Sequence, residues 1–347
     1  MQTTEIRLMK NDPRTREVAP VERAPGPGQA LARIDRFALT SNNVTYAAIG
    51  EAMGYWRFFP APEPWIIMPV WGFATVTESR AEGVAAGDRF YGYWPSASHA
   101  LLTPGPVKAH GFADMAPHRQ ALPPIYNAYS PVAPGTDEAA AALFRPLYGT
   151  GFVLADHLVE TAEPGAIILT SASSKTALAT AEGLRAAGRP ATGLTSAANR
   201  DFTLATGYYD QVLAYDDLAT LDAGAPATLV DFSGNARLKA ALHRHLRGLG
   251  ASHIVGATHW DVAPDAEPLP GPTPALFFAP TVWAAKAKAM GPAAFDAAMA
   301  AGMARFLATT RPWLTIIQES GPAAYETRLD KLLAGTASPA EGYVISL

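Results

Sequence analysis

The chain has 347 residues, of which 49% are hydrophobic and 17% charged, and its formal net charge is −4. This length is typical of two domains, the composition excludes a disordered or fibrous protein, and the charge gives no reason to expect nucleic acid or an anionic membrane as partner. The absence of cysteine excludes disulfides, thiolate nucleophiles, iron–sulfur clusters and cysteine-ligated zinc.

The first 130 residues have the pattern of a β-rich domain. Residues 1–18 are polar and mixed in charge, unlike a signal peptide. Short apolar or alternating runs then predict strands, separated by turns rich in Pro and Gly, at 30–34, 65–68, 73–77 and 89–93. No run reaches the roughly 20 apolar residues of a membrane span. We therefore expect a soluble, cytoplasmic protein.

After PGTDE (134–138) the pattern changes to alternating helices and strands. Residues 139–160 are helical in pattern, and we expect Pro146 to break that helix. The alternation that follows favours a parallel sheet flanked by helices. The predicted strands are 167–170, 191–195, 211–214, 228–231 and 252–256, with helices at 175–187 and 237–249. A proline-rich loop (263–274), a long amphipathic region (282–308) and a strand-like run (342–347) follow.

The most informative segment is AIILTSASSKTA, residues 166–177. A strand, a turn of small residues and a helix N-terminus form the architecture that holds a pyrophosphate in dinucleotide-binding folds. Serines and an alanine stand here where glycines are expected. Either the hydroxyls of Ser173, Ser174 and Thr176 and the ammonium of Lys175 bind phosphate, or one of the two serines caps the helix and the lysine is solvated.

The end of the second strand of this sheet indicates the cofactor. An NAD site places Asp or Glu about 20 residues beyond the loop, to bind the ribose hydroxyls. No acidic residue occurs between Gly193 and Arg200. Thr195, Ser196, Asn199 and Arg200 suit a 2′-phosphate instead, with the arginine as its charged anchor. The alternative is a surface arginine at the start of a helix. We therefore expect NADP(H) rather than NAD(H).

Several motifs in a fixed order resemble the medium-chain dehydrogenase/reductase superfamily, particularly its zinc-free quinone and enoyl reductase branch. The motifs are PVWGFATV (69–76), GVAAGDRFYGY (83–93), LFRPLYGTGFVLADHL (143–158), the loop segment, VDFSGN (230–235) and GASHIVGAT (250–258). The resemblance covers most of the chain and implies an α/β protein. A GroES-like catalytic β domain would comprise residues 1–130, completed by 312–347. A Rossmann-type, doubly wound parallel-sheet domain would comprise 131–311.

The resemblance also implies which residues contact the cofactor. The family's loop reads G-x-x-G-G-x-G, and Ser171, Ser174, Lys175 and Ala177 replace its glycines here. At the end of the fifth strand, Thr258 and His259 would lie near the nicotinamide. The expected cofactor-binding residues are Ser171, Ser173, Ser174, Lys175, Thr176, Thr195, Ser196, Asn199, Arg200, Thr258 and His259.

The proton donor is expected in residues 39–55. LTSNNVTYAAIG, followed by Gly54 and Tyr55, resembles the enoyl reductase region N-x-x-D…G-x-Y, with the usual acid replaced by Asn42 or Asn43. In that branch a tyrosine of this region can donate the proton, which indicates Tyr55 or Tyr46. The alternative is that both tyrosines are aromatic residues at the edge of the core. Because the zinc-dependent branch uses a cysteine ligand, no metal is expected.

These features predict NADPH-dependent reduction of an activated C=C bond or carbonyl in a small conjugated or quinone-like compound. The dense aromatic residues of the first domain favour an apolar or planar substrate. The alternative is a non-catalytic nucleotide-binding or regulatory protein that retains the reductase fold, and a third reading is a dimeric scaffold without nucleotide. The family's habit of pairing Rossmann domains suggests a homodimer.

Overall fold

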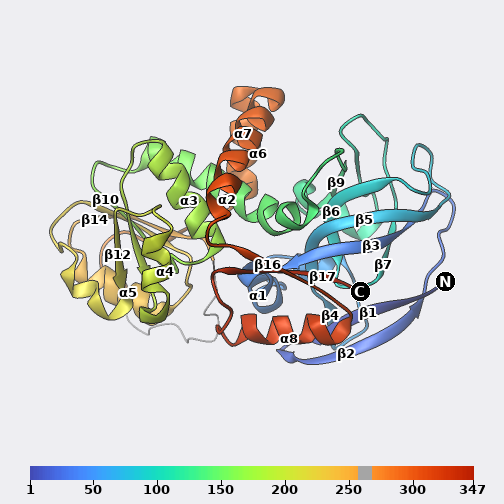
Figure 1. Ribbon diagram of the computed structural model, residues 1–347, viewed down its shortest axis with the longest axis horizontal. Coiled ribbons are helices and arrows are strands. Elements are labelled where there is room, and N and C mark those ends of the chain that lie inside the picture. The colour runs from blue at the N-terminus through green and yellow to red at the C-terminus, as the bar shows by residue number, and fades with distance from the viewer. Residues whose placement is uncertain (257–267) are drawn as a thin grey trace. The chain divides into compact units, whose positions relative to one another are not determined.

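The computed structural model describes residues 1–256 and 268–347 and divides into two compact units (Figure 1). Unit 1 comprises Met1–Leu143, Ile316–Ala337 and Glu341–Leu347, and unit 2 comprises Phe144–Thr315 and Ser338–Ala340. The divisions therefore fall after residues 143 and 315, whereas the sequence placed them after 130 and 311. Among the described residues, no helix combines the length and apolar character needed to cross a membrane.

Unit 1 is built on antiparallel strands. One sheet has the order β2-β1-β4, and a larger one has the order β16-β17-β3-β5-β6-β9-β8, with β7 also paired to β3. The strands are β1 (Gln2–Met9), β2 (Asp12–Glu22), β3 (Ala30–Leu39), β4 (Trp65–Ile67), β5 (Pro69–Ser79), β6 (Arg89–Pro95), β7 (His99–Leu102), β8 (Phe112–Ala113), β9 (Ala128–Pro131), β16 (Thr315–Ser320) and β17 (Glu341–Ser346). The four strands predicted before residue 130 are confirmed as parts of β3 to β6.

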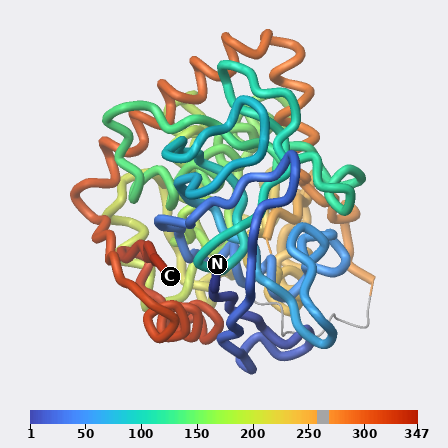
Figure 2. Tube along the Cα trace, turned by 90° about the vertical axis from the view of Figure 1, so that its right-hand side faces the viewer, coloured from blue at the N-terminus to red at the C-terminus, as the bar shows by residue number. Residues whose placement is uncertain are grey.

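The helices of unit 1 are short and pack on these sheets. They are α1 (Ser41–Ala48), α8 (Pro322–Leu333) and the 3-10 turns η1 (Tyr55–Phe58), η2 (Pro117–Arg119) and η3 (Pro124–Asn127). Helix α8 lies beside the N-terminal hairpin, as both ribbon and tube views show (Figures 1 and 2). Arg16 of β2 pairs there with Asp330, 314 residues away in sequence, and donates to the carbonyl of Glu326.

Unit 2 contains a parallel sheet with helices between its strands. Its order is β12-β11-β10-β13-β14-β15, which is the 3-2-1-4-5-6 order of dinucleotide-binding folds. The strands are β10 (Ala166–Leu169), β11 (Ala191–Thr195), β12 (Gln211–Ala214), β13 (Ala227–Asp231), β14 (Leu249–Ile254) and β15 (Ala275–Leu276). The direction of the strand order reverses between β10 and β13, and ligands of such sheets bind beyond the carboxyl ends at this point.

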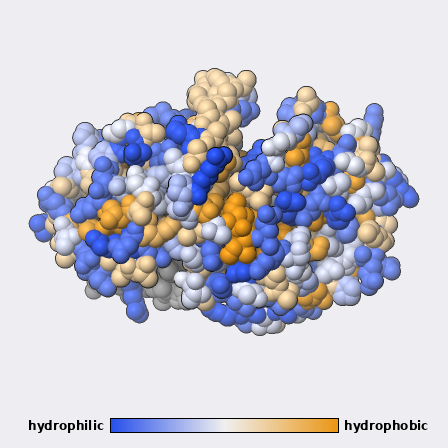
Figure 3. Space-filling model, viewed as in Figure 1, coloured by the Kyte–Doolittle hydropathy of each residue, from blue (hydrophilic) through white to orange (hydrophobic). Residues whose placement is uncertain are grey.

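Helices connect the strands of unit 2 and extend beyond them. They are α2 (Glu138–Thr161), α3 (Lys175–Ala186), α4 (Ala197–Ala205), η4 (Tyr215–Thr220), α5 (Ala236–His245), α6 (Ala279–Met290) and α7 (Pro292–Thr310). Helices α6 and α7 pack side by side, and the space-filling view shows the pale orange of their alanine-rich surface (Figure 3).

One expectation about helices was wrong. Helix α2 continues through Pro146, because one missing N–H removes a single bond while the neighbours Leu143, Phe144 and Leu147 are almost fully buried and hold the helix in place. The region 282–308, for which the sequence predicted only an amphipathic pattern, is divided between two helices, α6 and α7. Gly291 separates them with a φ of 83°, a left-handed conformation that glycine adopts without a steric cost.

Candidate functional site

The loop after β10 begins at the reversal point of the parallel sheet and ends at α3. Ser174 is the N-cap of α3, and its Oγ accepts a hydrogen bond from the backbone N of Ala177 at 3.4 Å. The capping role that the sequence offered for one of the two serines is therefore present. Capping does not exclude phosphate binding, because the remaining N–H groups of a first helical turn are donors for an anion.

Ser171 has the backbone conformation of a glycine. Its φ of 45° makes it the one non-glycine residue with positive φ among residues 1–256 and 268–347. A left-handed conformation costs an L-residue about 1–2 kcal/mol. The backbone N of Ser171 donates to the hydroxyl of Tyr215 at 3.1 Å, and such a bond contributes about 0.5–1.5 kcal/mol. The hydrogen bond thus offsets much of the steric cost.

A second tyrosine holds the next residue of the loop. The hydroxyl of Tyr209 donates to the carbonyl of Ala172 at 2.9 Å. Gly193 of β11 leaves room for this arrangement, since a Cβ there would lie 2.8 Å from the Cβ of Ala172 and 3.1 Å from the Tyr209 ring. Neither tyrosine was among the predicted site residues, although both flank the predicted third strand of the sheet.

Asp231 ties the ends of β10 and β13 together. It is fully buried, and its Oδ1 accepts from the Thr170 hydroxyl at 2.7 Å and from the backbone N and hydroxyl of Ser233 at 2.9 and 2.7 Å. Its Oδ2 has no hydrogen-bond partner in the part of the chain that the structure describes. Sequence reasoning did not select this residue, although VDFSGN was noted as a motif.

Three of the predicted cofactor residues are hydrogen-bonded to one another: Ser173 of the loop, Thr195 and Asn199. The Oγ of Ser173 accepts from the hydroxyl of Thr195 at 3.2 Å and from the Nδ2 of Asn199 at 3.3 Å. These bonds connect the loop to the end of β11 and the first turn of α4. The predicted contacts therefore gather on one edge of the parallel sheet, as expected for carboxyl ends of adjacent strands.

The remaining predicted residues differ in their surroundings. Ser196 is the N-cap position of α4, but its hydroxyl accepts no capping bond. The side chain of Arg200 is 46% exposed and lies 3.4 Å from the carboxylate of Asp201. The ammonium of Lys175 donates to the carbonyl of Pro339 at 3.2 Å. Thr176 lies in the first turn of α3, where its carbonyl accepts from the Thr180 hydroxyl. Thr258 and His259 lie outside the described residues.

In unit 1, Asn43 fixes the start of α1. Its Oδ1 accepts from the backbone N of Thr40 at 2.8 Å, and its Nδ2 donates to the carbonyl of Pro69 at 3.1 Å. The side chain is 3% exposed, and Thr40 completes a capping box with it. These bonds account for a structural role of Asn43.

Tyr46 lies in a buried cluster of tyrosines. Its hydroxyl oxygen accepts from the Nδ2 of Asn42 at 2.8 Å and from the Nε1 of Trp71 at 3.2 Å. Since both acceptor positions are used, the hydroxyl proton is left to be donated elsewhere. Burial raises the pKa of Tyr46 well above its ordinary value, and the two N–H donors act in the opposite direction.

Tyr55 packs against Tyr46 with ring centroids 4.6 Å apart. Its hydroxyl lies 3.5 Å from that of Tyr126, and burial raises the pKa of Tyr55. No N–H group is recorded as a donor to Tyr55 among the described residues. The two predicted tyrosines are therefore neighbours; Tyr46 has two N–H donors that would stabilise its phenolate, whereas Tyr55 has the hydroxyl of Tyr126.

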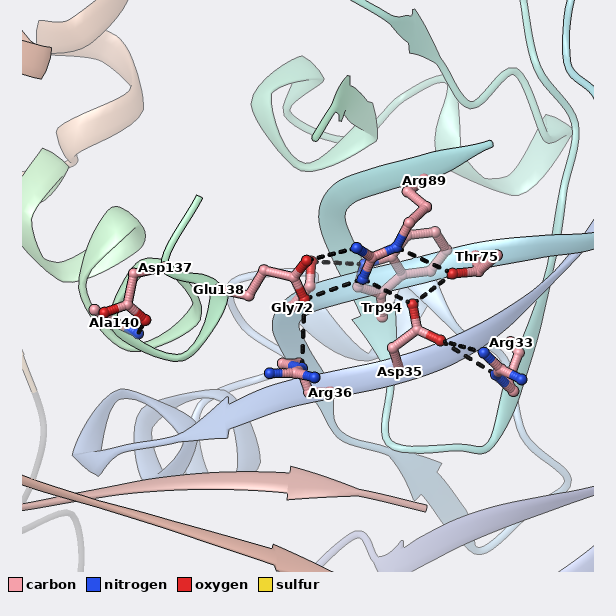
Figure 4. Close-up of polar contacts among 10 residues, drawn as sticks. All are labelled: Arg33, Asp35, Arg36, Gly72, Thr75, Arg89, Trp94, Asp137, Glu138 and Ala140. Carbon is pink, nitrogen blue, oxygen red and sulfur yellow. Dashed lines mark hydrogen bonds and ion pairs between the residues drawn. The ribbon is translucent and has the colours of Figure 1, made fainter. Parts of the chain in front are cut away.

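A charged network joins the first turn of α2 to the large sheet of unit 1 (Figure 4). Arg89 donates to both carboxylate oxygens of Glu138 at 2.7 and 3.0 Å, and to Asp35 at 3.2 Å. Arg33 also bonds Asp35, and Arg36 lies 3.4 Å from Glu138. Surface hollows of about 530, 440 and 370 Å³ border this network. Because its acids are already paired with arginines, the network holds the first turn of α2, which itself belongs to unit 1, rather than forming a reactive centre.

Within residues 1–256 and 268–347, no group of three or more histidines and acidic residues is arranged to hold a metal ion. The candidate site in unit 2 consists of hydroxyls, backbone N–H groups, the amide of Asn199, the ammonium of Lys175 and the guanidinium of Arg200. The candidate site in unit 1 consists of phenols and their N–H donors.

Comparison with protein families gives one match, which spans residues 37–338 and is described as "Protein of unknown function (DUF2855)". The chain belongs to this family. A comparison with curated protein sequences finds no match.

Solved structures identify the fold. CurA from Vibrio vulnificus superposes with a TM-score of 0.66 at 12% identity over 99% of this chain and 98% of that one, and it has also been solved in complex with NADPH. A mutant form of enoyl thioester reductase from Candida tropicalis superposes with a TM-score of 0.60 at 11% identity, over the full length of both chains. These likenesses show the fold: an antiparallel β unit and a unit with a doubly wound parallel sheet, which is the α/β architecture that the sequence predicted.

Proposed function

We propose that the protein is an NADP(H)-dependent, metal-independent reductase of an activated C=C bond or carbonyl in a small conjugated or quinone-like compound. The observation that carries this proposal is the loop at the reversal point of a 3-2-1-4-5-6 parallel sheet, which ends at the N-terminus of α3. The structural similarity to CurA, solved with NADPH, supports the same cofactor.

The residues present fit NADP(H). Ser171 supplies the left-handed conformation that a glycine supplies in other loops, so that a short loop leads from β10 to the first turn of α3. Ser173, Ser174 and this turn would hold the diphosphate. We assign the 2′-phosphate to the hydroxyl of Ser196, at the N-terminus of α4, and to the guanidinium of Arg200. The acidic residue that an NAD site places after the second strand would repel this phosphate.

NADPH, when bound, supplies the hydride. Tyr46 would supply the proton, because its hydroxyl oxygen accepts from Asn42 and Trp71, which would stabilise the phenolate left after proton donation. Tyr55 is the second candidate. Trp71 also stacks on Tyr91 with ring centroids 5.6 Å apart and an interplanar angle of 16°, and a half-buried indole of this kind favours an apolar or planar substrate.

A second candidate function is nucleotide binding without catalysis. The loop lacks glycine, and Tyr46 is only 4% exposed. Tight NADPH binding without turnover of any enone, quinone or aldehyde would favour this function over the reductase.

We also propose a homodimer, formed through the edge of the parallel sheet in unit 2. β15 is the last strand in its described order, and Leu276 on it is 61% exposed. A second copy of the chain would cover this leucine and extend the sheet, as the family resemblance implies. The cytoplasmic location stays a prediction from the sequence.

Fluorescence titration with NADPH and NADH tests the cofactor assignment. In the wild type we expect NADPH to bind more tightly than NADH. Arg200→Ala should weaken NADPH binding by about 1.5–3 kcal/mol, the contribution of a charge-assisted hydrogen bond, and leave NADH binding nearly unchanged. Equal losses for both cofactors, or no loss for either, would contradict the assignment of Arg200.

A further inference from the structure

The loop in which serines replace glycines is hydrogen-bonded to two tyrosines that flank one strand, β12. Tyr209 precedes β12 and Tyr215 follows it, so both are fixed to the same rigid element. The hydroxyl of Tyr215 accepts from the backbone N of Ser171, and that of Tyr209 donates to the carbonyl of Ala172. Two consecutive residues of the loop are therefore bonded to the ends of β12.

The hydrogen bonds from the two tyrosines lie at Ser171, the residue with the disfavoured backbone conformation, and at Ala172, the residue after it. Ser171 is 9% exposed and has a φ of 45°, a conformation disfavoured for any residue with a Cβ. The residue before it, Thr170, is fixed by the buried carboxylate of Asp231 at 2.7 Å. The residues after it, Ser173 and Ser174, are bonded to β11 and α3. The left-handed residue thus lies between two fixed segments, and Tyr215 bonds it directly.

We propose that Tyr215, assisted by Tyr209, is a positioning residue for nucleotide binding: it holds Ser171 in the conformation that glycine adopts unaided. The first turn of α3 then keeps the orientation that a diphosphate requires. The nucleotide part of this inference rests on the proposed function, whereas the conformational part concerns the loop alone. Since NADPH and NADH share the diphosphate, Tyr215 acts equally on both.

The test is a double-mutant cycle of Tyr215→Phe and Ser171→Gly. Tyr215→Phe removes only the hydroxyl and should weaken NADPH and NADH binding by the same factor, about fivefold, the loss of one hydrogen bond. The melting temperature of the free protein should fall as well. In the S171G background the backbone N–H still bonds Tyr215, but the same substitution should have a smaller effect on binding and melting than in the wild type, because glycine keeps the left-handed conformation without the bond.

Tyr208→Phe is the matched control. The hydroxyl of Tyr208 is hydrogen-bonded to the hydroxyl of Thr309 at 2.7 Å and not to the loop. The affinities for NADPH and NADH should therefore stay at the wild-type values. A loss for NADPH alone would show that Tyr215 contacts the 2′-phosphate, and would overturn the proposal. An equally large effect of Tyr215→Phe in both backgrounds, or none in either, would also overturn it.

Failure of the proposed function would look different. If the wild type binds neither nucleotide, the cofactor assignment is wrong, yet the melting temperatures of the four proteins still decide whether Tyr215 stabilises a left-handed Ser171.

Discussion

Ser174 is the residue at which helix capping and nucleotide binding make opposite predictions. Aspartate caps helices as well as serine does, so Ser174→Asp should leave the melting temperature unchanged or slightly raised. A carboxylate beside the diphosphate should nevertheless abolish NADPH binding by charge repulsion. Melting and NADPH titration of the same variant measure both effects.

Asparagine is the neutral control at this position. Ser174→Asn keeps a capping side chain without charge, so we expect a smaller loss of NADPH affinity than in Ser174→Asp. A well-folded Ser174→Asp protein with wild-type affinity would place the diphosphate elsewhere in the structure.

Tyr46 is the residue on which catalysis should depend. Tyr46→Phe should lower kcat by about 10²–10⁴-fold, the usual contribution of a general acid, without changing the Kd of NADPH. Asn42→Ala should have a smaller effect in the same direction, because Trp71 remains as a donor. Steady-state kinetics on an enone and quinone panel measure both.

The pKa of Tyr46 determines how the reduction rate should depend on pH. Because burial raises the pKa of Tyr46 above its ordinary value of about 10, the phenol stays protonated between pH 6 and 9. The rate should therefore show no alkaline loss from Tyr46 in this range. If Tyr55→Phe removed activity and Tyr46→Phe did not, the proton donor would be Tyr55.

The sequence predicted some of the site and missed the rest for a physical reason. Ser173 was expected at the diphosphate, and Thr195 and Asn199 at the 2′-phosphate; the structure brings the three into contact because adjacent parallel strands end at the same edge. Tyr209 and Tyr215 were missed because they contact the loop only in the folded structure. The two segments lie far apart in the sequence and share no pattern that would link them. The structural role of Asn43 has a local signal, since Thr40 and Asn43 have capping-box spacing.

At the scale of elements, five of the parallel strands were predictable because short runs with apolar residues alternate there with helical segments. All five residues of β13 are buried, and the predicted and observed bounds of β11 and β12 agree. The strands β1 and β2 were missed because their polar residues alternate with few large apolar ones. The two-residue strand β15 is too short to produce a pattern.

One ion pair joins α7 to α3. Glu182 on α3 is 5% exposed, and its carboxylate accepts from the Nε of Arg305 at 2.7 Å, although the arginine is 51% exposed. Arg305→Met should lower the free energy of unfolding by about 1–2 kcal/mol, since it leaves a buried carboxylate without its charged partner. Urea unfolding measures the loss.

The exposed pair Arg200–Asp201 is the control for this ion pair. Asp201 is 93% exposed, so Asp201→Asn should change the unfolding free energy by no more than about 0.5 kcal/mol. If Arg305→Met were equally neutral, α7 would be held by its apolar contacts alone.

At the scale of the whole molecule, the proposed dimer predicts a change of mass in solution. Leu276→Glu introduces a charge on β15 and should convert a dimer to a monomer in light scattering, with NADPH affinity unchanged. Met115, which is 45% exposed in unit 1, gives the control Met115→Glu, which should leave the dimer intact. A monomeric wild type would contradict the dimer.

The pairing of β17 with β3 sets the order in which the nascent chain can fold. Tyr343 lies opposite Leu39 in this ladder, so the partners are separated by roughly 300 residues of synthesis. At the usual rates of translation this delay is roughly 15–60 seconds. Almost all of unit 2 leaves the ribosome within that interval, while β3 still has an open edge. The unit that begins first is therefore completed last, and a ribosome that stalls before β17 leaves an unpaired strand available to other chains.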